Sequence, residues 1–314
     1  MPQSPHSAPL DVSDNASGRS RRFLQVDVFA PRAGTGNPLA VVLDVEGLDS
    51  AQMQAIAAWT NLAETTFVLP PTTAQAHYRV RIFTTRQEIA FAGHPSIGTA
   101  HAVLAAGLVP PASGLLVQEC QAGLLPVRIE PQEGGRSLSV RVPRSRIVRY
   151  AGEPGAGAGA DDDGVRRALG DRRLGSLAPC LVEGGRRWWL AELADEGEVR
   201  GMQPDFAAIS ALAGTTHSLG LCVFARCQSG RQLVVRAFPL GVGINEDPAS
   251  GAANAAIAAF LEEAGALAEL GNSYLVSQGR EMGRDARLRL EIDAERQVWV
   301  GGECQTVIEG SLRW

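Results

Sequence analysis

The chain has 314 residues, of which 45% are hydrophobic and 20% charged, and its formal net charge is −5. This length and composition predict a soluble globular protein of two domains, and a mildly acidic chain without a basic cluster argues against a nucleic-acid partner. No run of 18 apolar residues occurs, so no membrane span is expected. No secretory signal is visible at the start, and the five cysteines lack a C-x-x-C motif, which indicates reduced thiols in the cytoplasm.

The first stretch of the chain lacks the apolar residues that a packed core needs. Residues 1–21 are rich in Ser, Pro, Asp and Arg and show no periodicity, which predicts a disordered tail. Order is expected from Phe23 onward. The elements expected next are strands at 23–30, 39–43 and 65–69 and a helix over 51–59, which Asp49 or Ser50 can cap.

Glu64 stands where a loop enters the strand expected at 65–69. It is the only charged residue between Ala51 and Ala76, and apolar residues surround it in the sequence. A carboxylate in such a place should be partly desolvated, which would raise its pKa above the usual value of about 4.3. A carboxyl group with a raised pKa can shuttle protons near neutral pH. The alternative is a surface glutamate at a strand edge.

Beyond residue 70 the pattern gives many short strands and few helices. Strands are expected at 78–84, 87–91, 114–120, 125–129, 137–142, 180–183, 188–193, 219–225, 233–240, 273–277, 286–292, 297–300 and 305–312. Helices are expected over 96–106, 164–169, 205–214 and 248–264. The stretch 151–163, A-G-E-P-G-A-G-A-G-A-D-D-D, is low in complexity and predicts a mobile loop.

Two stretches of the chain resemble each other and each follows an apolar strand. They are A-G-H-P-S-I-G-T-A-H-A from Ala92 and E-D-P-A-S-G-A-A-N from Glu246, aligned so that Pro95 meets Pro248. Proline fits the first turn of a helix, so each stretch predicts a turn followed by a helix start. Two helix N-termini facing each other would bind a small anion such as a carboxylate. The alternative is that they are only the helix starts of a duplicated fold.

The remaining chemistry points to proton transfer. The histidines show no metal-ligand spacing, and neither a G-x-S-x-G motif nor a complete dinucleotide fingerprint occurs, so no metal and no cofactor are expected. Ser96 and Ser250 are interpreted as helix-start hydroxyls rather than nucleophiles. Glu64, His94 and Asp247 are left as candidate acids and base, a set suited to isomerisation or epimerisation at carbon. The fold class expected is α+β, built from two similar halves with the site in the cleft between them.

Several motifs in this order resemble the PhzF family of phenazine-biosynthesis isomerases. They are N-L-A-E-T-T-F-V around Glu64, F-A-G-H-P-S-I-G-T-A around His94, E-D-P-A-S-G around Asp247, S-Q-G-R-E-M-G-R at Ser277–Arg284 and V-G-G at Val300–Gly302. The resemblance spans roughly Phe23 to Leu312. It implies the fold of diaminopimelate epimerase, with two domains that each wrap a mostly antiparallel, barrel-like sheet around a central helix.

The resemblance also implies domain boundaries and an oligomeric state. The expected domains are 22–130 plus 301–314 and 131–300, because the last strand returns to the first domain. A cytoplasmic homodimer without a cofactor is implied. The substrate implied is a small carboxylate of the dihydroxyanthranilate type.

Roles for individual residues follow from the same resemblance. It implies that Glu64 is the acid/base that moves the proton, and that His94 and Asp247 hold and polarise the substrate. Contacts to the substrate are expected from the residues around the two helix starts: Gly93, Ser96, Ser250, Gly251 and Ala252. The family's isomerases have Ser where this chain has Ala252, so one hydroxyl of the pocket is absent and the phenazine substrate itself is open.

Three functions therefore stay open at this point. The first is a cofactor-independent isomerase that shifts a double bond in a small unsaturated carboxylate. The second is an epimerase or racemase that uses Glu64 and Asp247, because neither helix start carries the cysteine that diaminopimelate-type epimerases use. The third is a binding protein that kept the fold without the chemistry.

Overall fold

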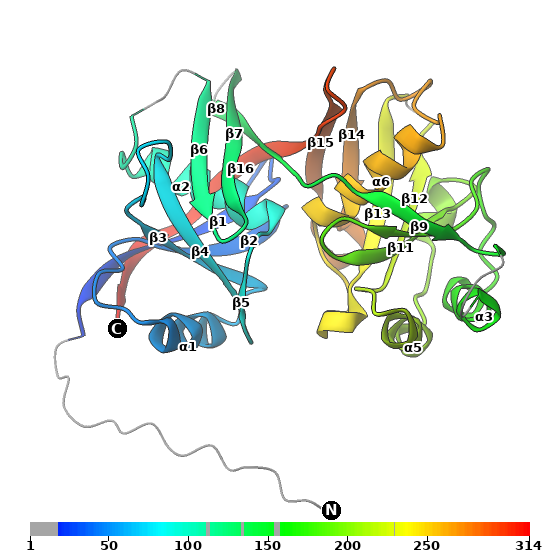
Figure 1. Cartoon of the computed structure of the whole chain (residues 1–314), viewed down its shortest axis with the longest axis horizontal. Helices are drawn as coiled ribbons and strands as arrows, with labels where there is room; N and C mark the ends of the chain where they lie inside the picture. Colours follow the sequence, from blue (N-terminus) through cyan, green and yellow to red (C-terminus); the bar gives the residue numbers. More distant parts are fainter. Residues whose placement is uncertain (1–17, 111–113, 133–134, 154–157, 229) are drawn as a thin grey trace, which may run out of the picture.

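The structure is a computed structural model, and it describes residues 18–110, 114–132, 135–153, 158–228 and 230–314. Two halves lie side by side, each a curved sheet around one helix (Figure 1). The central helix is α2 (Gly93–Ala105) in the first half and α6 (Gly251–Glu263) in the second. The predicted α+β fold with two similar halves is confirmed.

The first half is a closed barrel of eight strands. Its strands follow the order β1-β2-β3-β4-β6-β7-β8-β16, and β16 closes the ring because it pairs with both β8 and β1. The small strand β5 (Glu88–Ile89) pairs with β4 beside this ring. The barrel strands are β1 (Ser20–Val28), β2 (Asn37–Val42), β3 (Glu64–Leu69), β4 (Tyr78–Thr84), β6 (Leu115–Cys120), β7 (Gly123–Gln132), β8 (Gly135–Arg141) and β16 (Val298–Arg313).

The second half continues the same sheet from β16. The order runs β16-β15-β14-β13-β12-β11-β10-β9, so β16 belongs to both halves and crosses between them (Figure 1). These strands are β9 (Arg146–Tyr150), β10 (Cys180–Glu183), β11 (Arg187–Glu192), β12 (Leu221–Arg226), β13 (Gln232–Phe238), β14 (Ser273–Gln278) and β15 (Ala286–Ile292). The other helical elements are α1 (Ser50–Thr60), α3 (Ala158–Leu169), α4 (Glu196–Arg200), α5 (Phe206–Thr216) and the short 3-10 turns η1 (Leu240–Val242) and η2 (Arg280–Met282).

The central helices can lie inside the sheets because their side chains are small. Ten of the 13 residues of α2 and ten of the 13 residues of α6 are buried, and most of these buried residues are small or apolar. Gly98 of α2 leaves the space that the side chains of Val28 and Leu39 fill, since a β-carbon there would lie 2.7 and 2.5 Å from them. Alternation in β15, where every second residue is buried, then presents an apolar face to α6.

Three expected boundaries in the outer parts of the chain fall differently in the structure. Residues 1–17 of the expected tail lie outside the described part, and Ser20 and Arg21 already belong to β1. The expected loop 151–163 is in part a helix, because α3 begins at Ala158, while 154–157 are outside the described residues. The expected domain boundary at residue 130 falls inside β7, and the following strand β8 completes the first barrel. The division into two domains stays a prediction.

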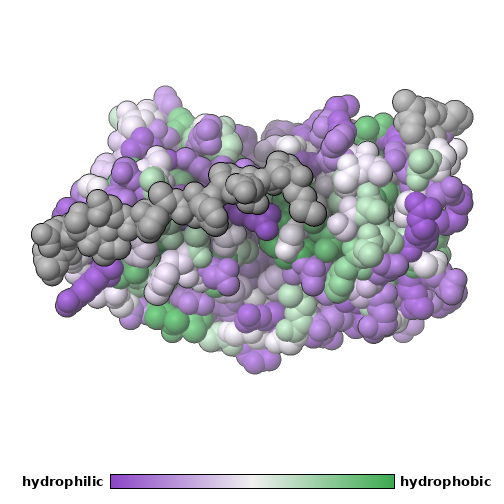
Figure 2. All heavy atoms as spheres, turned by 90° about the horizontal axis from the view of Figure 1, so that it is seen from below, coloured by the Kyte–Doolittle hydropathy of each residue, from purple (hydrophilic) through white to green (hydrophobic). Residues whose placement is uncertain are grey.

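Across the residues that the structure describes, none of the helices is both long and apolar enough to cross a membrane. The face seen from below mixes hydrophilic and hydrophobic side chains (Figure 2). All five cysteines are buried and unpaired.

Candidate active site

The N-termini of α2 and α6 meet at the boundary between the two halves. A β-carbon on Gly93 would lie 3.6 Å from the Cα of Gly251, and a β-carbon on Gly251 would lie 3.5 Å from the Cα of Gly93. A side chain at either position would therefore occupy the space between the two backbones. The first-turn N–H groups of both helices lie close together, which favours negative charge nearby.

This geometry corrects the alignment of the two similar stretches. Both helices have 13 residues, and they begin at Gly93 and Gly251, so these two glycines correspond in space. Pro95 is the third residue of α2, whereas Pro248 precedes α6 and Ser250 is the N-cap. The expectation that Pro248 lies in the first helical turn is wrong. The reason is that residues 247–250 are held by side chains from other elements instead of by helical hydrogen bonds.

Glu64 and His94 form a pair whose two facing atoms are buried and lack hydrogen-bond partners. Glu64 begins β3 and His94 is the second residue of α2, which brings the glutamate Oε2 within 3.4 Å of the histidine Nε2. Neither atom has a hydrogen-bond partner in the protein, although both are shielded from solvent. Buried polar atoms are normally paired, so two unpaired atoms side by side indicate a place for a ligand group.

Burial sets the charge of this pair. It raises the pKa of Glu64 to about 8, with the nearby Asp247 carboxylate adding to the rise. Burial also lowers the pKa of His94 to about 3. Near neutral pH the imidazole is therefore neutral and the carboxyl group is mostly protonated. The close approach of the two groups is therefore not an ion pair.

Asp247 approaches the same place from the second half. Its backbone N–H donates to the Ala237 carbonyl at the end of β13, and its carboxylate Oδ1 accepts hydrogen bonds from Asn37 Nδ2 at 2.9 Å and from the Ala249 N–H at 3.2 Å. Burial raises the pKa of Asp247 to about 6, and the hydrogen bonds from Ala249, Ser250 and Asn37 oppose this rise. Asp247 thus titrates close to neutral pH.

A buried amide network holds the start of α6. The Gln278 Oε1 accepts from the Ser250 N–H at 3.3 Å and from Asn254 Nδ2 at 2.9 Å, while its Nε2 donates to the Asp247 carbonyl at 2.8 Å. The Ser250 hydroxyl caps the helix by accepting from the Ala253 N–H. Gly279 follows in a left-handed conformation, φ 89°, where a β-carbon would lie 2.6 Å from the Pro248 carbonyl oxygen.

A second buried chain of hydrogen bonds holds the start of α2. This helix has no side-chain cap, and the Ser96 hydroxyl donates to the Ala92 carbonyl at 2.9 Å. Gln118 Nε2 donates to that hydroxyl at 3.0 Å, and the Tyr78 hydroxyl donates to Gln118 Oε1 at 3.2 Å. The hydroxyls of Ser96 and Ser250 thus both have partners in the protein.

The structure places the expected contact residues at or next to the two helix starts. Gly93, Ser96, Ser250 and Gly251 are buried, whereas Ala252 is exposed. The sequence analysis gave no role to Asn37 or Gln278, although Asn37 lies in the expected turn at 34–38 and Gln278 lies in the S-Q-G-R motif. The residues next to them in the sequence do not indicate a role at the site, because the groups that they bind are far away in the sequence. Among the described residues, no group of three or more His, Cys, Asp or Glu side chains could hold a metal ion.

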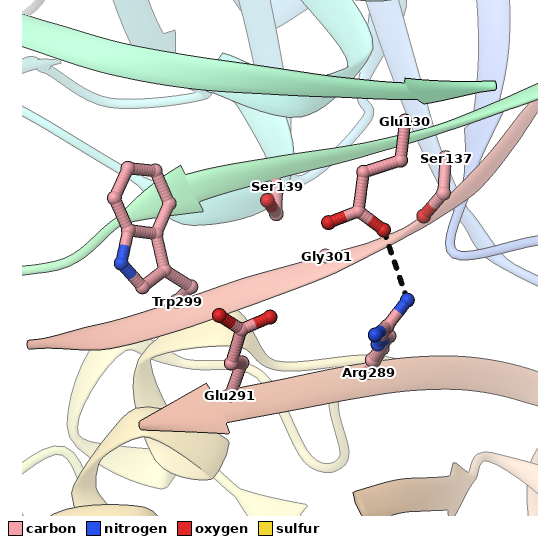
Figure 3. A pocket seen from close by; sticks show the side chains of 7 residues that line it. All are labelled: Glu130, Ser137, Ser139, Arg289, Glu291, Trp299 and Gly301. Atoms are coloured by element: carbon pink, nitrogen blue, oxygen red, sulfur yellow. Dashed lines mark hydrogen bonds and ion pairs between the residues drawn. The ribbon is translucent and has the colours of Figure 1, made fainter. Parts of the chain in front are cut away.

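A small hollow lies elsewhere, on the sheet where the two halves join. It is lined by residues of β7, β8, β15 and β16, and the ion pair between Arg289 and Glu130, 2.9 Å, spans it (Figure 3). Its volume is about 10 Å³, which is room for about one water molecule. None of Glu64, His94 and Asp247 lines it. This hollow is too small for a metabolite, and the helix starts remain the candidate site.

Residues 26–310 match the family model of the PhzC/PhzF phenazine biosynthesis-like proteins. The chain belongs to this family. Among its relatives is the trans-2,3-dihydro-3-hydroxyanthranilate isomerase of Pseudomonas chlororaphis, 31% identical over 298 residues, which are 92% of this chain and 98% of that protein. Antisense-enhancing sequence 1 of Schizosaccharomyces pombe is 32% identical over 296 residues, 92% of this chain and 97% of that protein.

Solved structures share the fold of this chain. A PhzF-family protein of Bacillus anthracis has a TM-score of 0.78 at 23% identity, over 94% of this chain and 99% of that chain. A hydroxyproline epimerase of Agrobacterium vitis has a TM-score of 0.65 at 15% identity, over 94% of this chain and 92% of that chain. At these identities the likeness shows the fold, which PhzF proteins and epimerases share. Several curated relatives are named as isomerases, and this PhzC/PhzF chain is an isomerase.

Proposed function

We propose that this PhzC/PhzF enzyme moves a proton between two carbons of a small unsaturated carboxylate metabolite, without a cofactor, and that Glu64 carries the proton. The observation that supports this most is the pair of unpartnered buried atoms, Glu64 Oε2 and His94 Nε2, beside the two meeting helix starts. We propose that Glu64, His94 and Asp247 together form the active site. The family resemblance also supports a cytoplasmic homodimer as the working state.

The proposed step needs no oxidant or reductant. Ionised Glu64 takes a proton from a C–H group of the substrate, the electron pair of that bond enters the conjugated system, and the double bond shifts. Glu64 then gives the proton to a second carbon and is ionised again. A pKa of about 8 suits this exchange, since a carboxylate with the usual lower pKa would be a weaker base.

The other groups of the site hold the substrate while the proton moves. The first-turn N–H groups of α2 and α6 suit the substrate carboxylate, because backbone donors and helix dipoles both favour an anion there. Neutral His94 can donate or accept one hydrogen bond at Nε2 without adding a charge. Asp247 supplies a carboxylate from the opposite half, which suits a hydroxyl or amino group of the substrate.

The relatives' named substrate gives the direct test. The enzyme is incubated with trans-2,3-dihydro-3-hydroxyanthranilate and with related unsaturated acids in deuterated water, and the products are followed by NMR. We expect a shifted double bond and deuterium at one defined carbon. An inverted stereocentre without a double-bond shift would support the epimerase alternative instead. Tight binding of these acids without any exchange would support the binding protein.

Anion recognition can be tested separately from turnover. If the helix starts bind the substrate carboxylate, replacing that carboxylate by an amide should weaken binding at least about tenfold, because hydrogen bonds to a charged group contribute roughly 1.5–3 kcal/mol each. Sulfate should compete with the acid and not with the amide. Isothermal titration calorimetry measures both affinities. Equal affinities for acid and amide would contradict the assignment of the helix starts.

A further inference from the structure

Asn37 joins the first half of the protein to the catalytic carboxylate of the second. It is the first residue of β2 and only 2% exposed. Its side-chain Nδ2 makes two hydrogen bonds, and both cross the boundary: one to Asp247 Oδ1 at 2.9 Å and one to the Ala249 carbonyl at 3.0 Å. Both N–H bonds of the amide are thereby used, and they fix the turn that leads into α6.

The backbone before Asn37 is held as firmly as its side chain. The buried carboxylate of Asp27 in β1 accepts from the Gly36 N–H at 3.0 Å. A β-carbon on Gly36 would lie 2.2 Å from the Val28 carbonyl oxygen, so the chain passes where only glycine fits. On the other side, the Asp285 N–H donates to the Thr35 carbonyl at 2.9 Å. Asn37 therefore has little freedom to turn away from Asp247.

This tight passage gives a stability prediction. Replacing Gly36 by alanine should lower the denaturant concentration at the midpoint of unfolding, because backbone or side chains must move to admit the methyl group. Chemical denaturation measures the change. Gly310→Ala in β16 is the control, since nothing lies within 4 Å of the β-carbon position of Gly310. Equal stability of the two variants would contradict this account of the Gly36 passage.

We propose that Asn37 is a positioning residue that holds the Asp247 carboxylate in one orientation across the boundary and favours its ionised form. The inference rests on the proposed function, in which Asp247 contacts the substrate. Asn37 itself need not touch the substrate or the reacting atoms. It acts through Asp247, and through the charge of Asp247 on Glu64.

The charges around Asp247 make the Asn37 amide important. Asp247 interacts through its charge with three acidic groups: Glu64, Glu246 and the thiol of Cys222. The Glu246 carboxylate is bound by Arg236, with both distances 2.9 Å, so this arginine is engaged by another carboxylate. The groups that favour ionised Asp247 are hydrogen-bond donors: the Ala249 N–H, the Ser250 hydroxyl and Asn37. Of these, Asn37 alone comes from the first half.

The hydrogen bond from Asn37 to Asp247 also affects the pKa of Glu64 indirectly. The charge of ionised Asp247 is one of the two causes that raise the pKa of Glu64. If Asp247 loses the Asn37 amide, it binds a proton more readily, and its effect on Glu64 weakens. The amide thereby tunes the basicity of a carboxylate that it does not touch.

The experiment follows Asp247 directly. Protein labelled with carbon-13 at the aspartate side-chain carboxyl carbon is titrated by NMR, and Asp247→Asn identifies the Asp247 signal. The other aspartates with clearly displaced pKa values in the described chain, Asp44, Asp195, Asp285 and Asp293, are shifted downward, so a signal that titrates near pH 6 stands apart. Asn37→Ala should raise the pKa of Asp247 by about one unit, because a donor to the charged form is lost.

Two further variants keep the test decisive. Asn37→Asp has nearly the same shape but presents a carboxylate to Asp247, so it should raise the pKa further; it also serves if the alanine variant does not fold. Asn254→Ala is the matched control, because Asn254 is a buried amide of the same helix start that donates to Ser250 and Gln278 and not to the Asp247 carboxylate.

The results separate this inference from the proposed function. An unchanged Asp247 titration in the folded Asn37 variants would overturn the inference, as would an equal shift in Asn254→Ala, which would mean that general loosening is the cause. The titration uses no substrate. A shifted Asp247 pKa together with unaltered turnover in Glu64→Gln would therefore overturn the proposed mechanism and leave the role of Asn37 standing.

Discussion

Replacing Glu64 by glutamine is expected to lower turnover by about 10²–10⁴-fold, because general acid–base catalysis typically contributes that much. Glutamine keeps the size of the side chain and can still form hydrogen bonds, but it cannot accept a proton from one carbon and return it to another. Affinity for the substrate should change by less than about tenfold, since a neutral amide replaces a carboxyl group that is mostly neutral near pH 7. Single-turnover kinetics in deuterated water and calorimetric binding measure the two quantities.

The control for this experiment is another glutamate of the same chain. Glu309→Gln removes a carboxylate from an exposed part of β16, away from the helix starts, and should leave turnover unchanged. The decisive readout is deuterium incorporation into the substrate. If Glu64→Gln exchanges deuterium at the wild-type rate, Glu64 is a structural residue and the proposed mechanism is wrong. Asp247→Asn should differ by impairing both binding and turnover, because Asp247 is assigned to holding the substrate.

The same glutamine variant should make the protein more stable at alkaline pH. The pKa of Glu64 rises from 4.5 to about 8 on folding, so between these values the folded state binds a proton that the unfolded state has lost. The free energy of unfolding therefore falls as pH rises from 4.5 to 8, and the whole penalty is present above pH 8. Glutamine has no such penalty. At pH 8 Glu64→Gln should exceed the wild type by roughly 2–4 kcal/mol.

Urea denaturation at a series of pH values measures this difference. The advantage of Glu64→Gln should shrink as pH falls and vanish near pH 4, where the carboxyl group is protonated in both states. Asp247 contributes a smaller penalty of the same sign, because its pKa also rises on folding. A constant difference between the two proteins at every pH would show that Glu64 is not desolvated in the folded state. Such an outcome would remove the physical basis of its proposed role.

The part of the site that depends on local sequence could be predicted. Glu64 is the one charge in a long uncharged stretch, and local composition alone indicates that it enters the barrel desolvated. The two central helices could be predicted from local sequence as well, since α2 and α6 are rich in alanine and other small residues. The family resemblance then implied the two-domain fold and the return of the last strand to the first domain. Periodicity by itself could not place one helix start against the other.

The part that depends on distant partners could not be predicted. The turn before α6 is held by Asn37 and Gln278, which are 210 and 31 residues away from Asp247, so an alignment based on prolines put the wrong residues opposite each other. The start of α3 is a second example. Its acidic residues Asp161 and Asp162 pair with Arg149 at 2.7 and 3.3 Å, and this partner lies outside the low-complexity stretch.

The strand shared by both halves has a consequence for the order of folding. Ser20 pairs with Arg313, and Val28 pairs with Cys304, so the first barrel is closed by residues from the far end of the chain. Synthesis from the N-terminus therefore leaves β1 without one neighbour until β16 has been made. Contacts of such large sequence separation are slow to form because a long loop must close first. The α2 helix start, and with it the Glu64–His94 pair, should therefore reach its final place only after β16 has docked.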